Sequence, residues 1–203
     1  MSNGQASMTA VSDEDLARAH VYHLLGHLLA RSPDKQMLAL IDSIDDQAPD
    51  SDTPLSEAWR ELRRAAGSAQ PAPLEEEYFK LFIGLGRGEL MPYASWYLHG
   101  ALMERTLAEL RQDLKRLGFA RCDEVAEPED HAAALCETLG MIISDPGLSL
   151  EQSAFFQIYL DGWMGRFFAD LEAAETADFY RAVGQLGRRF MELERRLFAL
   201  PAE

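Results

Sequence analysis

Apolar residues recur at three- and four-residue steps along almost the whole chain, which is the spacing of one face of an α-helix. The clearest run is Phe179, Val183, Leu186, Phe190, Leu193 and Leu197, with steps of 4, 3, 4, 3 and 4. A stripe this short predicts a packing face within a helical bundle rather than a free coiled coil. Because no segment shows the alternating pattern of a strand, the sequence predicts an all-α protein of about eight helices.

Capping signals and helix breakers set the limits of the predicted helices. Ser12 with Asp15, Ser32 with Pro33, and Thr53 with Pro54 are typical helix starts. Polar or glycine- and proline-rich stretches at 45–53, 67–73 and 84–88 are typical breaks. The predicted helices span about 12–30, 32–44, 54–66, 74–82, 96–117, 128–144, 149–172 and 179–197.

The chain of 203 residues, 47% of them hydrophobic, is long enough for one substantial core. A chain of this size buries roughly 70% of its unfolded surface. We expect a single domain over residues 1–203, or two lobes at about 12–118 and 131–200 joined by a hinge at 119–130. Cys122 and Cys136 stand apart from any Cys or His pattern, so neither a disulfide framework nor a zinc ribbon is predicted.

The chain is strongly acidic, with 19 Lys and Arg against 34 Asp and Glu and a net charge of −15. This charge argues against a nucleic-acid binder, because Lys and Arg supply the affinity for phosphates, and it favours a basic partner. Residues 1–15 lack the charged and apolar regions of a secretory or twin-arginine signal, and no stretch approaches ~18 continuous apolar residues. We therefore expect a cytoplasmic, reduced protein without stable membrane insertion.

Two local patterns raise the alternative of an enzyme. His20, His23 and His27 fall on one helix face and are candidate metal ligands, but no Cys or carboxylate at ligand spacing completes a site. The glycine run Gly84 to Gly88 lacks the strand-to-helix context of a phosphate loop. Carboxylate runs such as Glu75 to Glu77 are expected to be solvated or to stabilise helix dipoles. No catalytic residue and no metal site is predicted.

Two segments combine side chains that suit a peptide-binding site. The first runs from Tyr78 to Phe82 and continues from Met91 to Gly100, and its aromatics offer an apolar body with a polar tip. The second ends in Asp130 and His131 at a predicted helix start. A carboxylate and an imidazole there can hold a cationic group by a charge-assisted hydrogen bond, although helix capping explains both residues equally well.

Together these segments resemble the TorD/DmsD/NarJ family of cytoplasmic maturation chaperones for molybdenum enzymes. The resemblance covers about a third of the chain, from Tyr78 to Met141. Its residues are the Tyr-x-x-Leu-Phe run (Tyr78, Leu81, Phe82), the segment Pro92 to Tyr97, and Glu127 to His131 followed by Leu135, Glu137 and Met141.

The resemblance implies a non-enzymatic chaperone that binds the twin-arginine signal peptide and the apo form of a molybdenum-cofactor oxidoreductase, assists cofactor insertion and prevents premature export. It implies no cofactor of the chain's own, since the molybdopterin belongs to the client; weak guanine nucleotide binding is left open. A monomer or a domain-swapped dimer is expected. The implied residues for binding the signal peptide and client are Tyr78, Leu81, Phe82, Pro92, Tyr93, Trp96, Asp130 and His131.

The residues agree with this implication on physical grounds. A twin-arginine peptide carries two guanidiniums and then an apolar stretch, so its receptor needs carboxylates beside an apolar groove, and a negative field steers the peptide toward it. Three alternatives remain: a NarJ-like assembly factor for a cytoplasm-facing molybdoenzyme, a metal- or nucleotide-dependent enzyme, and a helical adaptor.

Overall fold

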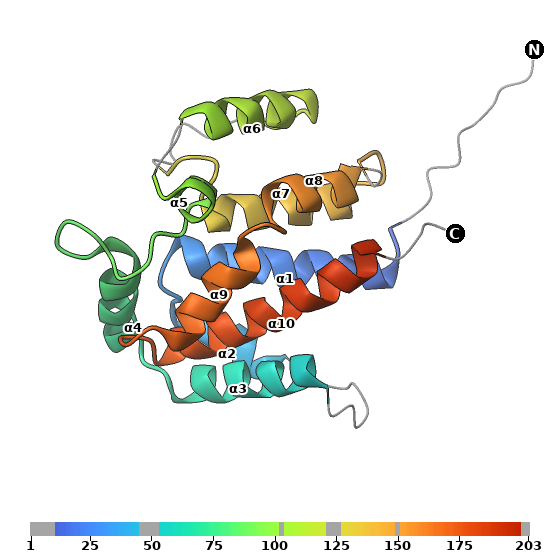
Figure 1. Ribbon diagram of the computed structural model, residues 1–203. Helices are drawn as coiled ribbons and strands as arrows, with labels where there is room; N and C mark the ends of the chain where they lie inside the picture. The colour runs from blue at the N-terminus through green and yellow to red at the C-terminus, as the bar shows by residue number, and fades with distance from the viewer. Residues whose placement is uncertain (1–10, 45–52, 102–103, 121–126, 149–150, 200–203) are drawn as a thin grey trace, which may run out of the picture.

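The computed structural model describes residues 11–44, 53–101, 104–120, 127–148 and 151–199, and over these residues the protein is all-α (Figure 1). The described part holds ten α-helices and one π-helical turn, η1, and no strand. In chain order these are α1 (Asp13–Ala30), α2 (Lys35–Ser43), α3 (Pro54–Ser68), α4 (Pro71–Tyr78), η1 (Phe79–Ile83), α5 (Ala94–His99), α6 (Glu104–Arg116), α7 (Ala132–Ser144), α8 (Gln152–Tyr159), α9 (Met164–Ala173) and α10 (Phe179–Ala199).

Helix α1 lies in the middle of the molecule, with α6 and α3 at opposite edges of the view in Figure 1. Helix α1 packs along α7, while α10 packs against both α9 and α3. The predicted division into two lobes stays a prediction, because residues 121–126 of the proposed hinge lie outside the described residues. Large side chains that are almost fully buried fill the space between these helices, namely Tyr22, Phe156, Trp163, Phe167, Phe168, Tyr180 and Phe190.

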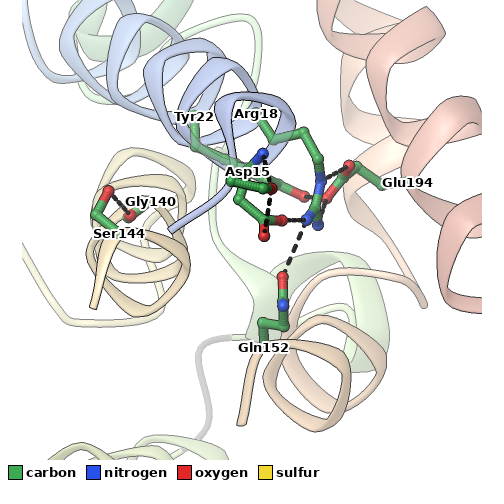
Figure 2. A network of polar contacts seen from close by, with 8 residues as sticks. Asp15, Arg18, Tyr22, Gly140, Ser144, Gln152 and Glu194 are labelled. Atoms are coloured by element: carbon green, nitrogen blue, oxygen red, sulfur yellow. Dashed lines mark hydrogen bonds and ion pairs between the residues drawn. The ribbon is translucent and has the colours of Figure 1, made fainter. Parts of the chain in front are cut away.

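A buried polar network joins α1 to α10 and α8 (Figure 2). The Arg18 guanidinium donates to both carboxylate oxygens of Glu194, at 2.7 and 2.8 Å, and Glu194 is fully buried. Tyr22 donates its hydroxyl hydrogen to the same carboxylate at 3.0 Å. The remaining Arg18 donor reaches Asp15 at 2.6 Å and Gln152 at 3.0 Å. These contacts compensate for burying two opposite charges, and they fix how the N-terminal and C-terminal helices meet.

Two predicted helix starts are confirmed and a third is shifted. The Ser12 hydroxyl accepts from the Asp15 N–H at 3.1 Å, and Thr53 caps α3 in a reciprocal box with Ser56. The predicted start at Ser32 and Pro33 is wrong by two residues. Helix α2 is capped by Asp34, whose carboxylate accepts from the Met37 N–H at 2.8 Å.

The two longest predicted helices, 96–117 and 149–172, are each divided in the structure, into α5 and α6 and into α8 and α9. The described residues therefore hold ten α-helices where about eight are predicted. Helix α5 ends at Gly100, whose φ of 73° is the left-handed conformation that favours glycine at a helix end. Helices α8 and α9 are separated by a turn in which the Trp163 indole donates to the Tyr159 carbonyl at 2.8 Å. The predicted helix start at Ser149 lies outside the described residues. Helix α7 begins four residues later than predicted, at Ala132.

Two glutamates hold the region around η1 against the connection between α9 and α10. The Glu77 carboxylate accepts from the backbone N–H groups of Asp178 and Tyr180, each at 2.8 Å. The Glu89 carboxylate accepts from the backbone N–H of Glu175 at 2.7 Å. Glu77 thus caps the start of α10 from a different part of the chain, and η1 with its glycine loop is fixed at both ends.

Candidate peptide-binding groove

A groove of about 800 Å³ lies between the end of α1, the connection to α2, the α4–η1 segment and α7. Its apolar side is formed by η1, and its opposite side by residues near the start of α7. The side chains that give it its chemistry are Arg31, Asp34, Glu75, Tyr78, Phe79, Phe82, Ile83, Tyr93, Glu127, His131 and Glu137.

The π-helical turn decides which side chains face the groove. Leu81 points into the core and is completely buried, whereas Phe79 and Ile83 are 40% and 53% exposed. The turn is closed by Gly84, with a φ of 61°, and by Gly88, where a Cβ would stand 2.5 Å from the Leu81 carbonyl oxygen. Two large apolar side chains are thus left exposed next to a tight glycine turn, and an exposed apolar patch suits binding more than stability.

An aromatic cluster supports the floor of the groove. The Tyr78 and Phe82 rings lie 5.1 Å apart, and Phe82 packs edge-on against Tyr180 at 5.4 Å. Tyr78 donates its hydroxyl hydrogen to the Leu29 carbonyl at 3.1 Å, and Tyr180 donates to the Leu28 carbonyl at 3.0 Å. Burial raises the pKa of Tyr78 to about 12, so this hydroxyl remains a donor at neutral pH.

The two segments selected from the sequence meet directly at one end of the groove. The Ala94 N–H donates to the Asp130 carbonyl at 3.0 Å, and the Ala132 N–H donates to the Pro92 carbonyl at 2.8 Å. Between these bonds, the Tyr93 and His131 rings pack edge to face with centroids 5.1 Å apart. The junction presents one phenol ring and one imidazole to the groove.

His131 has two roles at this junction. Its Nδ1 accepts from the Ala133 N–H at 3.1 Å and so caps α7. Burial lowers the pKa of His131, which favours the neutral ring that this cap requires. With Nδ1 acting as the acceptor, the proton resides on Nε2, and that N–H is a donor available to a ligand.

The groove is negatively charged. Its described lining includes four carboxylates, from Asp34, Glu75, Glu127 and Glu137, against the single guanidinium of Arg31. Glu127 also accepts a hydrogen bond from the Tyr93 hydroxyl. The groove therefore places carboxylates next to the exposed apolar side chains of η1.

Comparison with known proteins identifies the family of this chain. The family model of the nitrate reductase delta subunit matches residues 48–169. The chain belongs to the nitrate reductase delta subunit family. This membership confirms the resemblance to the TorD/DmsD/NarJ group.

Relatives of this member of the nitrate reductase delta subunit family include proteins named chaperone protein TorD. The one from Shewanella sp. strain MR-4 is 25% identical over 86% of this chain and 90% of that protein. The one from Shewanella pealeana is 27% identical over 87% of each chain. A crystal structure from Archaeoglobus fulgidus, named provisionally as a redox enzyme maturation protein, has the same fold, with a TM-score of 0.59, 21% identity, and coverage of 86% of this chain and 93% of that one.

In this family member, the eight predicted site residues divide into three groups. Tyr78, Phe82, Tyr93 and His131 line the groove, whereas Trp96 lines a separate cavity. Leu81, Pro92 and Asp130 are buried and do not line the groove. A direct contact of these three residues with a ligand stays a prediction.

The sequence alone does not single out three residues that line the groove, Glu75, Phe79 and Ile83. Their spacing is the signal that was available, because Glu75, Phe79 and Ile83 follow one another at four-residue steps on one helical face. Glu75 belongs to an acidic run that the sequence predicts to be solvated or to stabilise a helix dipole.

The features behind the enzyme alternative have ordinary structural positions in this family member. His23 lies against Gly140 of α7, where a Cβ would come within 2.8 Å of its ring. Among the described residues, no three His, Cys, Asp or Glu side chains are arranged to hold a metal ion. The helices of the described ranges include none long and apolar enough to span a membrane.

Proposed function

We propose that this protein is a cytoplasmic, non-enzymatic chaperone of the TorD type that binds the twin-arginine signal peptide of a molybdenum-cofactor oxidoreductase in the groove between η1 and α7. One observation carries the proposal: four carboxylates and the exposed apolar side chains of η1 line the same groove. A twin-arginine peptide has the complementary order, with two cationic side chains followed by an apolar stretch.

The carboxylates supply the cationic half of recognition. Arginine pairs with a carboxylate through two parallel, charge-assisted hydrogen bonds, which lysine cannot reproduce. Glu75, Glu127 and Glu137 are exposed, so they can reorient toward a ligand without first losing a buried partner. The net charge of −15 raises the association rate of a cationic peptide and makes that rate depend on salt.

The η1 side chains supply the apolar half. Burying Phe79 and Ile83 beneath a peptide removes apolar surface from water, and this stabilises the complex against dissociation. The aromatic cluster beneath Phe82 is already packed, so little ordering is required on binding. The His131 Nε2–H can donate to a peptide carbonyl at the junction end.

This chaperone role has consequences for the client. While the signal peptide is covered, export cannot begin, and the apo form is held in the cytoplasm until its molybdopterin is inserted. The chaperone needs no cofactor of its own for this task. The names of the TorD relatives support such a role, and we expect a monomer or a domain-swapped dimer.

Calorimetry with three matched peptides tests the proposal. Each peptide carries the same apolar segment of ten residues after a pair of residues that is Arg-Arg, Lys-Lys or Gln-Gln. We expect the Arg-Arg peptide to bind most tightly and to weaken as salt is added. Phe82→Ala and Glu127→Gln should each reduce its affinity about tenfold, the effect of losing one charge-assisted hydrogen bond or a comparable apolar contact.

The control is Glu57→Gln, which removes the same charge from an exposed position at the start of α3. It should leave the affinity within about twofold, because a distant surface charge is screened by salt. Equal binding of the Arg-Arg and Gln-Gln peptides, or undiminished binding in both groove variants, would remove the proposed site.

A second candidate is a NarJ-like assembly factor for a cytoplasm-facing reductase that has no cleaved signal. The family description, which names a nitrate reductase, favours a reductase as the client. The same groove would then hold the N-terminal segment of that client. Co-purification followed by sequencing of the client's N-terminus separates the two candidates, because only the first leaves a twin-arginine signal on the bound protein.

A further inference from the structure

A second cavity of about 310 Å³ shares no lining residue with the groove. It lies where the glycine loop, α5 and α9 meet, and Trp96 is the one predicted site residue that lines it. Its other principal lining residues are Arg87, Glu89, Tyr97, Arg166 and Asp170. The aromatic segment 93–97 thus contributes to two separate sites.

Two arginines in this cavity are stacked on aromatic rings. The Arg87 guanidinium carbon lies 5.4 Å from the centre of the Trp96 ring, and that of Arg166 lies 5.0 Å from the centre of the Tyr97 ring. A guanidinium held over an aromatic ring retains N–H donors that can bind a carboxylate through two hydrogen bonds. Arg166 also donates to the Tyr97 carbonyl, which fixes its position.

The acidic side chains of the cavity already have partners. Glu89 accepts from the Glu175 and Thr176 backbone N–H groups, and Asp170 accepts from the Tyr97 hydroxyl at 2.9 Å. Arg87, in contrast, has no hydrogen-bonded or ion-paired acceptor among the described residues. The guanidiniums are therefore the groups that this cavity can offer to a ligand.

The charge balance selects the class of ligand. The lining holds two arginines and two carboxylates, so it is close to neutral as a whole and suits a carboxylate better than a polyphosphate. Beside Arg87, the loop presents Leu85 with 99% of its side chain exposed, between Gly84 and Gly86. A ligand that has an acidic side chain next to an apolar one satisfies both features.

We propose that this cavity binds an acidic peptide segment with an apolar neighbour, and that the segment belongs to the body of the client rather than to its signal. A cationic signal peptide fits the acidic groove and not a pair of arginines, so the two sites take different parts of one protein. The identity of the client rests on the proposed function; the acidic-peptide chemistry of the cavity does not.

Nitrogen-15 NMR with a defined probe tests this proposal. The probe is the capped peptide Gly-Leu-Glu-Leu-Glu-Gly, and the matched control peptide has Gln in place of both Glu. We expect saturable shifts of the Trp96 indole N–H and the Arg87 Nε–H with the Glu peptide and not with the Gln peptide. Arg87→Gln should weaken the Glu peptide about tenfold, as expected for one charge-assisted contact. Arg64→Gln, on the exposed face of α3, should not weaken it.

The twin-arginine peptide, measured on the same samples, keeps the two proposals separate. Arg87→Gln should retain twin-arginine binding, and Glu127→Gln should retain binding of the Glu peptide. If the unmodified protein bound the Glu peptide but not the twin-arginine peptide, the proposed function alone would be overturned. Equal shifts with the Glu and Gln peptides, or no shift at Trp96, would overturn this inference. It would also be overturned if inorganic phosphate or guanosine triphosphate produced shifts that the Glu peptide cannot displace.

Discussion

One carboxylate oxygen of Asp130 accepts two hydrogen bonds from Ser95, from its backbone N–H at 3.0 Å and from its hydroxyl at 2.6 Å. Asp130 is 1% exposed and Ser95 is fully buried. The contact ties the start of α5 to the residue that precedes the α7 cap, and it lies within the junction that presents Tyr93 and His131 to the groove. Asp130 therefore helps to hold Tyr93 and His131 in place, although it does not line the groove itself.

Replacing Asp130 should lower the free energy of unfolding more than it lowers the affinity for a signal peptide. Asp130→Ala leaves the buried N–H and hydroxyl of Ser95 without an acceptor, and we expect the free energy of unfolding to fall by about 3 kcal/mol. Asp130→Asn retains one acceptor oxygen and should lose less than half of that. Urea unfolding followed by circular dichroism measures both variants. Equal stability of the alanine variant and the unmodified protein would contradict the anchoring role of Asp130.

A binding measurement separates positioning from direct contact. If Asp130 acts through Ser95, then Asp130→Asn should retain most of the affinity for the Arg-Arg peptide, whereas Glu127→Gln should not. A folded Asp130→Asn variant that loses binding as severely as Glu127→Gln would place the Asp130 charge in the binding site itself.

Asp130 and His131 also show how far sequence reasoning reaches. The family resemblance implies that both residues share one binding site with the aromatic segment. The sequence could not decide between capping and ligand contact, since an aspartate at a helix start satisfies both patterns. In the structure, Asp130 accepts hydrogen bonds from Ser95, whereas His131 caps α7 with one nitrogen and also lines the groove.

The helical class was predictable for a general reason, since periodicity is a local property of the chain. The predicted helix limits are wrong where a local conformation or a tertiary contact overrides the apolar periodicity. Gly100 interrupts an otherwise continuous apolar pattern, and Trp163 closes a turn inside another. The acidic lining of the groove was not predictable, because Asp34, Glu75 and Glu127 are distant in sequence and come together only through packing.

The buried histidine at the junction predicts a loss of stability in mild acid. Burial lowers the pKa of His131 below its ordinary value of 6.5, so the unfolded chain takes up a proton at a higher pH than the folded protein does. Its contribution to stability is therefore fully present above about pH 6.5 and declines as the pH falls through the lowered pKa. The free energy of unfolding should decrease between about pH 7 and pH 5.

A capping asparagine isolates this effect. His131→Asn retains an acceptor at the α7 cap but cannot titrate, so its stability should depend less on pH over this range than that of the unmodified protein. His20→Asn changes an exposed histidine of α1 and serves as the control. Identical pH profiles for His131→Asn and the unmodified protein would show that His131 does not couple protonation to folding.

The buried pair of Arg18 and Glu194 predicts strongly unequal effects of single and double substitution (Figure 2). Arg18→Met leaves the buried Glu194 carboxylate with Tyr22 as its one remaining donor among the described residues, and we expect it to cost about 3–5 kcal/mol. Combining Arg18→Met with Glu194→Leu removes both charges and should recover much of that loss. Denaturant unfolding of the two single variants and the double variant gives the coupling energy directly. Additive losses would show that the two residues are energetically independent.

At the crossing of α9 and α10, Gly187 has no room for a side chain, whereas Gly165 does. At Gly187 of α10, a Cβ would come within 2.3 Å of the Phe168 ring, which is itself completely buried. Gly187→Ala should therefore separate the helices and lower the free energy of unfolding by about 1–3 kcal/mol, the usual effect of overpacking. At Gly165 of α9, the nearest atom to a new Cβ belongs to the flexible end of Arg195, at 3.4 Å. Gly165→Ala should be neutral or stabilise the protein by up to about 1 kcal/mol, because alanine loses less backbone entropy on folding than glycine does. Thermal unfolding of both variants tests the contrast, and equal destabilisation by the two alanines would show that glycine's role at this crossing is not steric.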